Sequence, residues 1–303
     1  QFKKKYIQFN TETFTYGLCY FVIGLFKKII LADNIANYAN IVFNTASTTS
    51  VMPFVESWLG GLAYTLQIYF DFSGYSDMAI GLALMFGIIL PINFDSPYKA
   101  VSVVDFWKRW HITLSRFLKN YIYIPLGGNR LGNLRRNTNL LTTMLLGGLW
   151  HGAAWTFVIW GVLHGIYLVV THSITRTLEK FDIKYSKRYR IIIGRLNVLI
   201  LITIAWVYFR AETVNDAHKI IKGMLGFNGL DLPRFLLFIK EIPFIEQSFY
   251  NYIRFDGSFP LGLMNFEVLP LFIALLLIIN FLPNTQDWMN YSPIDTRYSI
   301  KSN

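Results

Sequence analysis

Residues 149–165 read LWHGAAWTFVIWGVLHG, an apolar run whose only ionisable side chains are those of His151 and His164. An imidazole is costly to bury in a membrane-like segment, so such a residue usually faces a partner, a cavity or a reaction. The stretch 106–111 reads FWKRWH and places His111 in a second aromatic setting. Together the two stretches predict a membrane enzyme built around buried histidines.

The composition agrees with a protein that crosses a membrane several times. The 303 residues are 53% hydrophobic and 15% charged, with a mean hydropathy of +0.38, whereas soluble domains carry about 25% charged residues. The net charge of +10 comes from Lys and Arg clustered between apolar runs, as the positive-inside rule expects for cytoplasmic loops. We therefore expect no nucleic-acid partner. Cys19 is the single cysteine, so no intrachain disulfide is possible.

The hydropathy pattern predicts an all-α fold, a polytopic bundle of transmembrane, interfacial and re-entrant helices. A polar stretch, Asp71 to Asp77, separates two of the apolar runs. Residues 102–121 form an amphipathic pattern that we expect to be one helix, lying in the interface or re-entering the membrane. Residues 213–247 are expected to be interfacial or loop-like. The expected apolar helices are 14–31, closed by two lysines, then 53–70, 78–90, 191–209 and 267–282.

Two basic loops, 127–136 and 176–190, flank the apolar segment 138–174. If both loops are cytoplasmic, the segment must cross the membrane and return, with its midpoint near Thr156. His151 would then lie deep in the membrane or toward the far leaflet. A single span with one loop outside is the alternative.

Each histidine has a catalytic and a structural interpretation. His111 and His151 could act as general bases, because imidazole titrates near neutral pH. Either could also be a packed residue whose ring is satisfied by a hydrogen bond. For His164, which lies between Gly161 and Gly165 in a small-residue pattern, packing is the favoured interpretation.

The carboxylates of Asp71 and Asp77 could orient a histidine, line a polar tunnel or cap a helix break. The sequence contains no Gly-x-Ser-x-Gly elbow, no His-Glu-x-x-His motif and no pair of cysteines. We therefore expect no metal site and no covalent serine mechanism. Direct transfer through buried histidines fits the pattern better.

The motifs resemble the membrane-bound O-acyltransferase (MBOAT) family, in its alginate-type bacterial branch. The resemblance covers nearly the whole chain and rests on the order and spacing of five stretches. These are 16–36 with its FKK turn, 69–81 (YFDFSGYSDMAIG), 93–128 with DFWKRWH, 150–165 from WHG onward, and 281–286 (FLPNTQ).

The resemblance implies a bowl of helices around a central tunnel, with His151 as the family's signature histidine and His111 as the second histidine of this branch. Supporting positions along the tunnel would be Asp71, Asp77, Trp150, Trp107, Arg109 and His164. Residues 1–303 would be a single but partial transmembrane domain, because N-terminal spans of the family, and a further C-terminal helix, are expected outside this chain.

The resemblance also implies an acetyl transfer enzyme of the inner membrane that contains no bound cofactor. The donor would be acetyl-CoA on the cytoplasmic side. The acetyl group would pass to a periplasmic SGNH-type acetyltransferase, working with machinery for polysaccharide synthesis or export, and modify a polysaccharide such as alginate. Membrane lipid would surround the helices. The alternatives are acetylation of peptidoglycan or another glycan, a transporter without covalent chemistry, and a scaffold for polysaccharide enzymes.

Overall fold

The computed structural model describes residues 10–182, 186–231, 253–254 and 268–290, which are predominantly helical. This confirms the all-α prediction, apart from the two-residue parallel pair β1 (Leu230–Asp231) and β2 (Ile253–Arg254). The principal helices are α1 (Thr11–Phe26), α2 (Asp33–Thr48), α3 (Phe54–Met85), α4 (Val103–Arg109), α5 (Ile112–Leu118), α6 (Gly132–His151), α7 (Trp155–Lys180), α8 (Lys187–Arg210), α9 (Val214–Met224), α11 (Val268–Phe281) and α12 (Thr285–Trp288).

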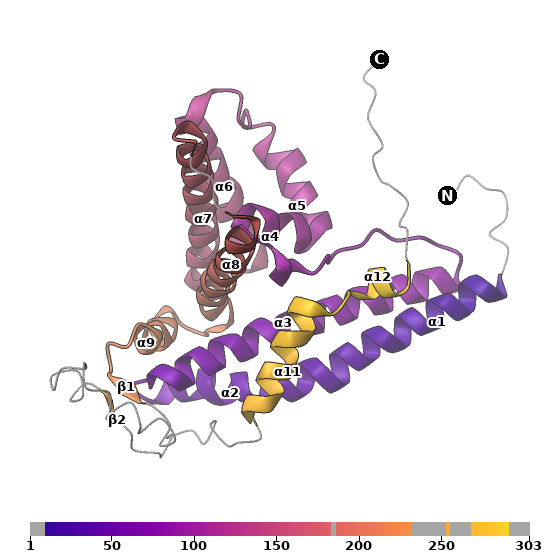
Figure 1. Ribbon diagram of the computed structural model, residues 1–303, viewed down its shortest axis with the longest axis horizontal. Coiled ribbons are helices and arrows are strands. Elements are labelled where there is room, and N and C mark those ends of the chain that lie inside the picture. Colours follow the sequence, from indigo (N-terminus) through magenta and orange to yellow (C-terminus); the bar gives the residue numbers. More distant parts are fainter. Residues whose placement is uncertain (1–9, 183–185, 232–252, 255–267, 291–303) are drawn as a thin grey trace.

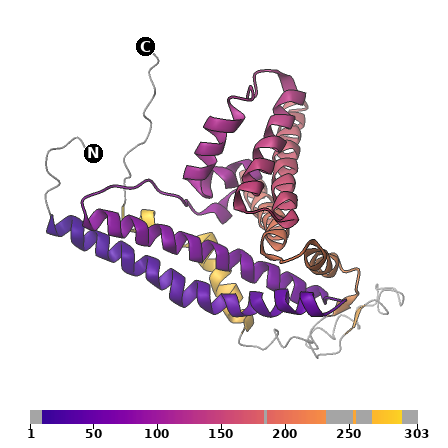
Figure 2. The same ribbon diagram turned by 180° about the vertical axis from the view of Figure 1, so that it is seen from behind.

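The helices fall into two groups that meet along α3 (Figure 1). One group is a long layer in which α1 and α2 run beside α3, with α11 crossing the layer on the face turned toward the viewer. The other group holds α4 to α8, and Figure 2 shows it from behind with α11 on the far side of the layer. A core cluster rich in aromatic side chains, including Phe94, Phe106 and Trp206, joins the two groups.

Within the described part of the chain, three helical segments are long and apolar enough to cross a membrane: Thr11–Thr48, Trp155–Lys180 and Lys187–Arg210. The last two confirm the apolar runs expected on either side of the basic loop 176–190. The shorter helix α11 confirms the run predicted over 267–282, although Leu282 lies just beyond its end. Many large apolar side chains on these segments are exposed, including Val22, Ile174 and Ile192, as expected for surfaces that face lipid rather than water.

The predicted helix 14–31 does not end at its lysines. A π-helical turn, Lys27–Ala32, connects α1 directly to α2. Lys28 contacts Asp33 at 2.8 Å and Asp71 at 2.7 Å, and Lys27 is paired with Asp77. Because each ammonium group has a carboxylate partner, the lysines can lie inside a continuous helix instead of ending it.

The stretch Asp71 to Asp77 was expected to separate two helices, but it lies inside the unbroken 32-residue helix α3. Glycines of α3 allow its close contact with α1. A Cβ placed on Gly74 would lie 2.7 Å from the carbonyl oxygen of Gly24, and a Cβ on Gly81 would lie 2.5 Å from that of Gly17. Helices in membranes commonly use such small residues to bring their backbones together.

The segment 138–174 forms the predicted hairpin, with α6 and α7 side by side (Figures 1 and 2). The chain reverses at Gly152–Ala154, slightly before the predicted midpoint. Glycines again allow close approach, since a Cβ on Gly161 would lie 2.5 Å from the carbonyl oxygen of Met144. His151 is therefore the last residue of α6, at the turn of the hairpin.

The single amphipathic helix predicted over 102–121 is wrong. The chain forms α4, breaks at Trp110 and His111, continues as α5 and then enters a π-helical turn, Lys119–Tyr123. His111 adopts a left-handed backbone conformation with φ +41°, which is uncommon outside glycine and terminates the helix. Periodicity could not indicate this break, because the apolar spacing continues across it.

The prediction for 213–247 can be compared with the structure only as far as residue 231. Residues Val214–Met224 form the amphipathic helix α9, which is fastened to α3 by a hydrogen bond from Trp58 Nε1 to the carbonyl oxygen of Met224 at 2.9 Å. Residues 232–247 lie outside the described part of the chain.

We predict that Gly74→Val lowers the thermal denaturation temperature of the detergent-solubilised protein. The new side chain would meet the backbone of Gly24 and part of Lys27, and overpacking of this kind costs about 1–3 kcal/mol. The matched control is Tyr75→Val, which introduces the same residue at the adjacent position, where the side chain is 64% exposed. Equal melting temperatures for the two variants would contradict the backbone contact between α1 and α3.

Candidate active site

His111 projects from the break between α4 and α5, and the break is held by residues that precede α4. The N–H of Ile112 donates to the carbonyl oxygen of Asn93 at 3.0 Å. The hydroxyl of Thr113 donates to the Asn93 side chain at 2.7 Å. On the other side, Phe72 of α3 packs edge-on against the imidazole at 4.8 Å between ring centroids. The ring is therefore positioned by a loop and a neighbouring helix rather than by its own helix.

His151 lies where α6 ends, in a pocket of aromatic rings. Trp160 of α7 meets it edge-on at 5.2 Å between centroids, and Phe209 of α8 does so at 4.9 Å. The ring of Trp150, the preceding residue, lies 4.9 Å from the imidazole between centroids, and Trp150 is 64% exposed. This arrangement fixes the plane of the imidazole while leaving the side chain only half-buried.

The two histidines belong to one aromatic neighbourhood. A continuous series of aromatic contacts connects them, with centroid distances of 4.8–5.3 Å at each step. From His111 the series passes through Phe72, Phe94, Trp110, Trp206 and Phe209 to His151. Residues from α3, the following loop, the break between α4 and α5, α6 and α8 thus form one aromatic wall.

His164 is fully buried beside this wall. The indole Nε1 of Trp107 donates to its Nδ1 at 3.2 Å, and its ring lies 4.7 Å from that of Trp160. The Nε2 of His164 has no hydrogen-bond partner within the described residues. His164 and Trp107 therefore support the position of Trp160, which in turn contacts His151.

Asp71 and Asp77 are not brought to the histidines. Asp77 is 1% exposed and accepts hydrogen bonds from Lys27 Nζ at 2.6 Å and from the Thr285 hydroxyl at 2.7 Å. Asp71 pairs with Lys28 at the surface of the same helix layer. Within the described residues, neither carboxylate is hydrogen-bonded to a histidine, and neither caps a helix break. Their observed contacts fasten α3 to the turn after α1 and, for Asp77, to α12.

Arg109 is a structural anchor close to His111. Its Nε donates to Asp105 Oδ1 at 2.9 Å, and its Nη1 donates to the carbonyl oxygen of Asp95 at 3.2 Å. The guanidinium therefore holds the loop before α4 against the end of α4. Since the same loop carries Asn93, Arg109 contributes indirectly to the position of His111.

Several residues of this neighbourhood were not singled out from the sequence. Phe72, Asn93, Trp206 and Phe209 all contact a histidine or hold its backbone. Phe72 and Asn93 lie in motif stretches, but nothing local distinguishes them as site residues. Phe209 lies three residues after Trp206 on α8, so the two rings share one helix face. That spacing was the sequence feature that could have indicated an aromatic cluster here.

Chemically, the arrangement offers two imidazoles in an apolar setting. Burial lowers the pKa of His111, which lies outside the three candidate membrane helices. A neutral imidazole can accept a proton from a hydroxyl or thiol, as a general base requires. Among the residues that the structure describes, no group of three or more His, Cys, Asp or Glu is placed to hold a metal ion.

Comparison with known proteins gives a match over most of the chain. Residues 1–211 match the model of the MBOAT, membrane-bound O-acyltransferase family. A peptidoglycan O-acetyltransferase of Helicobacter pylori is 51% identical over 233 residues, which is 77% of this chain and 43% of the relative.

Two further relatives have different names. A Pseudomonas putida protein named "Probable alginate O-acetylase AlgI" is 41% identical over 240 residues, 77% of this chain and 47% of the relative. A teichoic acid D-alanyltransferase of Streptococcus thermophilus is 30% identical over 162 residues, 51% of this chain and 39% of the relative. The chain thus spans less than half the length of these relatives.

We predict that Asp77→Asn destabilises the protein far more than Asp71→Asn. Removing the Asp77 charge leaves the Lys27 ammonium, whose side chain is 15% exposed, without its counterion, and breaking a buried pair costs about 3–5 kcal/mol. The Asp71 and Lys28 side chains are 46% and 41% exposed, and such pairs contribute no more than about 1 kcal/mol.

Thermal denaturation in detergent measures both variants side by side. Similar losses of stability would show that the Lys27–Asp77–Thr285 contact is not the stronger of the two anchors.

Proposed function

The chain belongs to the membrane-bound O-acyltransferase family, and we propose that it takes part in moving an acetyl group from a cytoplasmic donor to a glycan outside the inner membrane. The observation that carries this proposal is the pair of histidines joined by one aromatic wall, at the turn of α6–α7 and at the break of α4–α5. In this proposal both rings act as neutral bases among aromatic side chains.

In the proposed reaction, His151 accepts the proton of the attacking hydroxyl as its oxygen forms a bond to the acetyl carbon of a thioester. The carbon–sulfur bond then breaks, and the proton is returned to the leaving sulfur, so that an ester and a thiol result. In this proposal His111 assists from the other end of the aromatic wall. Phe209 and Trp160 limit water around His151 and hold its ring in position.

The donor that we propose is acetyl-CoA, used as a substrate rather than a bound cofactor. Its entry from the cytoplasm is supported by charge: Arg135, Lys180 and Lys187 lie at the ends of α6, α7 and α8 opposite to His151. Positive ends of membrane helices face the cytoplasm, so the histidine turn would lie toward the other side. This arrangement supports a multi-pass protein of the inner membrane.

The acceptor that we propose is a hydroxyl group of an extracytoplasmic glycan. Peptidoglycan and an exported polysaccharide such as alginate are the two candidates, because relatives named for each match over about three quarters of the chain. A periplasmic SGNH-type acetyltransferase that completes the transfer, next to the synthesis or export machinery, is the proposed partner. A transporter or scaffold without chemistry is disfavoured, since these relatives are named as transferases or acetylases.

We also propose that residues 1–303 belong to one transmembrane domain. The family match ends at residue 211, but Thr285 and Gln286 hydrogen-bond to Asp77 of α3. A contact that joins residues 208 positions apart supports a single folded unit.

We predict that His151→Ala lowers glycan O-acetylation by at least about 100-fold, the lower end of what general acid–base catalysis contributes. His111→Ala is expected to have a smaller effect. The measurement is acetate released by mild base from purified peptidoglycan and, separately, from exported polysaccharide of cells producing each variant at equal membrane abundance. The fraction that loses acetate identifies the acceptor.

His172→Ala is the matched control, because His172 is a half-buried histidine of α7 outside the aromatic wall. Normal acetate in both fractions of the His151→Ala cells would refute the assignment of His151 as the base. Loss of acetate in the His172 variant as well would indicate a general defect of folding or insertion.

A further inference from the structure

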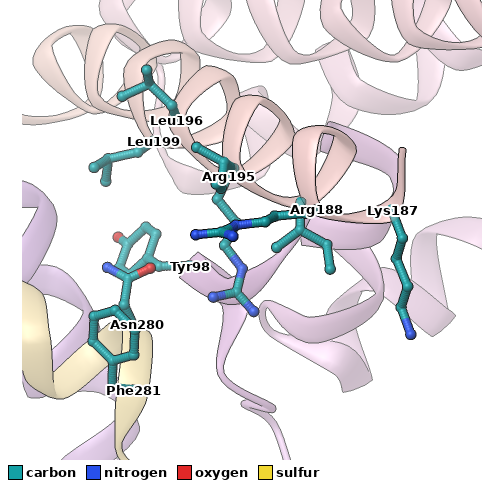
Figure 3. A pocket seen from close by; sticks show the side chains of 10 residues that line it. Tyr98, Lys187, Arg188, Arg195, Leu196, Leu199, Asn280 and Phe281 are labelled. Carbon is teal, nitrogen blue, oxygen red and sulfur yellow. The ribbon is translucent and has the colours of Figure 1, made fainter. Parts of the chain in front are cut away.

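A cavity of about 820 Å³ lies between the first half of α8, the end of α11 and the short 3₁₀ turn Pro97–Lys99 (Figure 3). Its lining includes no histidine, and it lies close to the basic end of α8. Arg188 and Arg195 extend from α8 toward the same space, and Tyr98, Asn280 and Phe281 lie across from them. The remaining lining residues are Lys187, Ile191, Ile192, Leu196 and Leu199.

The cavity carries a concentrated positive charge. Lys187, Arg188 and Arg195 all line it, and none of them forms an ion pair within the described part of the chain. The Nε of Arg195 is shielded from solvent yet has no hydrogen-bond partner there. A shielded guanidinium N–H without an acceptor is unfavourable, so the site is suited to an anionic oxygen.

The rest of the lining is apolar and follows one face of α8. Positions 188, 191, 192, 195, 196 and 199 recur at the three- and four-residue spacing that places side chains on one stripe. Ile192 is 54% exposed, Leu196 51% and Phe281 74%. Because α8 is a candidate membrane helix, we expect these side chains to face the acyl-chain region. Lys187 and Arg188 lie at the basic end of α8, and Arg195 lies about two turns further along the same face.

The floor of the cavity is rigid. Tyr98 is 2% exposed, its hydroxyl donates to the carbonyl oxygen of Thr65 at 2.8 Å, and it accepts a hydrogen bond from Trp206 Nε1 at 3.2 Å. Lys99 Nζ donates to the carbonyl oxygen of Leu282 at 2.6 Å and so joins the turn to the end of α11. A ligand here would contact elements that are already held together.

We propose that this cavity binds one anionic phospholipid of the cytoplasmic leaflet. The headgroup phosphate contacts Arg188 and Arg195, with Lys187 at the rim, and one acyl chain lies along Ile192, Leu196 and Phe281. Anionic lipids favour clustered Lys and Arg at the cytoplasmic surface, and guanidinium groups can bind phosphate through two parallel hydrogen bonds. The cations of the cavity would favour an anionic lipid over a zwitterionic one. Its apolar lining would favour a lipid over a free anion.

Native mass spectrometry of the detergent-solubilised 303-residue protein tests this proposal. The probes are phosphatidylglycerol and phosphatidylcholine of the same acyl composition, added at equal concentrations. We expect one phosphatidylglycerol to be retained with an affinity at least about tenfold above that of phosphatidylcholine. Arg188→Gln combined with Arg195→Gln should reduce phosphatidylglycerol binding about tenfold or more, and Leu196→Ser should weaken it without abolishing the preference for negative charge.

Two matched controls accompany these variants. Arg176→Gln with Lys180→Gln removes two cations from the adjacent basic end of α7, outside the cavity. Ile193→Ser changes a 37% exposed apolar residue of α8 that does not line the cavity. Both controls should bind phosphatidylglycerol as the unaltered protein does.

Three results would overturn the proposal. One is equal retention of the two lipids, and another is equal loss of binding in the cavity and control variants. The third is displacement of bound phosphatidylglycerol by micromolar coenzyme A, which would make the cavity a nucleotide-thioester site. Because the lipid measurement involves no acetyl transfer, its failure leaves the proposed function untouched, and failure of the His151 experiment leaves the lipid site untouched.

Discussion

Direct contact between helix backbones is the constraint on which this structure depends. In lipid there is little hydrophobic force to press one helix against another, so association relies on close packing. Glycines provide it in both helix groups: Gly24 and Gly74 bring α1 against α3, and Gly148 and Gly161 bring α6 against α7. The first pair forms the long helix layer, and the second forms the hairpin whose turn follows His151. The remaining elements are placed relative to these two pairs.

The sequence predicted the elements whose boundaries are local. The apolar run of α8, the run of α11 and the α6–α7 hairpin followed from hydropathy and from the basic loops beside them. The uninterrupted α3 could not be predicted in this way, because Asp77 is stabilised inside the helix by Lys27 and Thr285, which lie 50 and 208 residues away. Likewise, the break at His111 depends on hydrogen bonds to Asn93, not on the pattern within 102–121.

The candidate site was predictable to a similar degree. His111, His151, His164 and Trp107 meet around one aromatic cluster, since ionisable or hydrogen-bonding groups in apolar runs must turn inward. Asp71 and Asp77 satisfy the same rule with lysine partners in the turn between α1 and α2. Residue type alone could not separate these outcomes, because a buried carboxylate can accept a hydrogen bond from either an ammonium or an imidazole. The fold determines which side chain lies within hydrogen-bonding distance of each carboxylate.

The hydrogen bond from Trp107 to His164 has a spectroscopic consequence. An indole N–H can only donate, so Nδ1 of His164 must be the accepting nitrogen and its single ring proton resides on Nε2. Of the five histidines, His164 is therefore held in one tautomer. A ligand cannot reach its ring, because the side chain has no exposed surface. In a protein labelled with ¹⁵N-histidine, its resonances would serve as an internal reference, and ligand-dependent changes elsewhere in the imidazole region would report on the other rings.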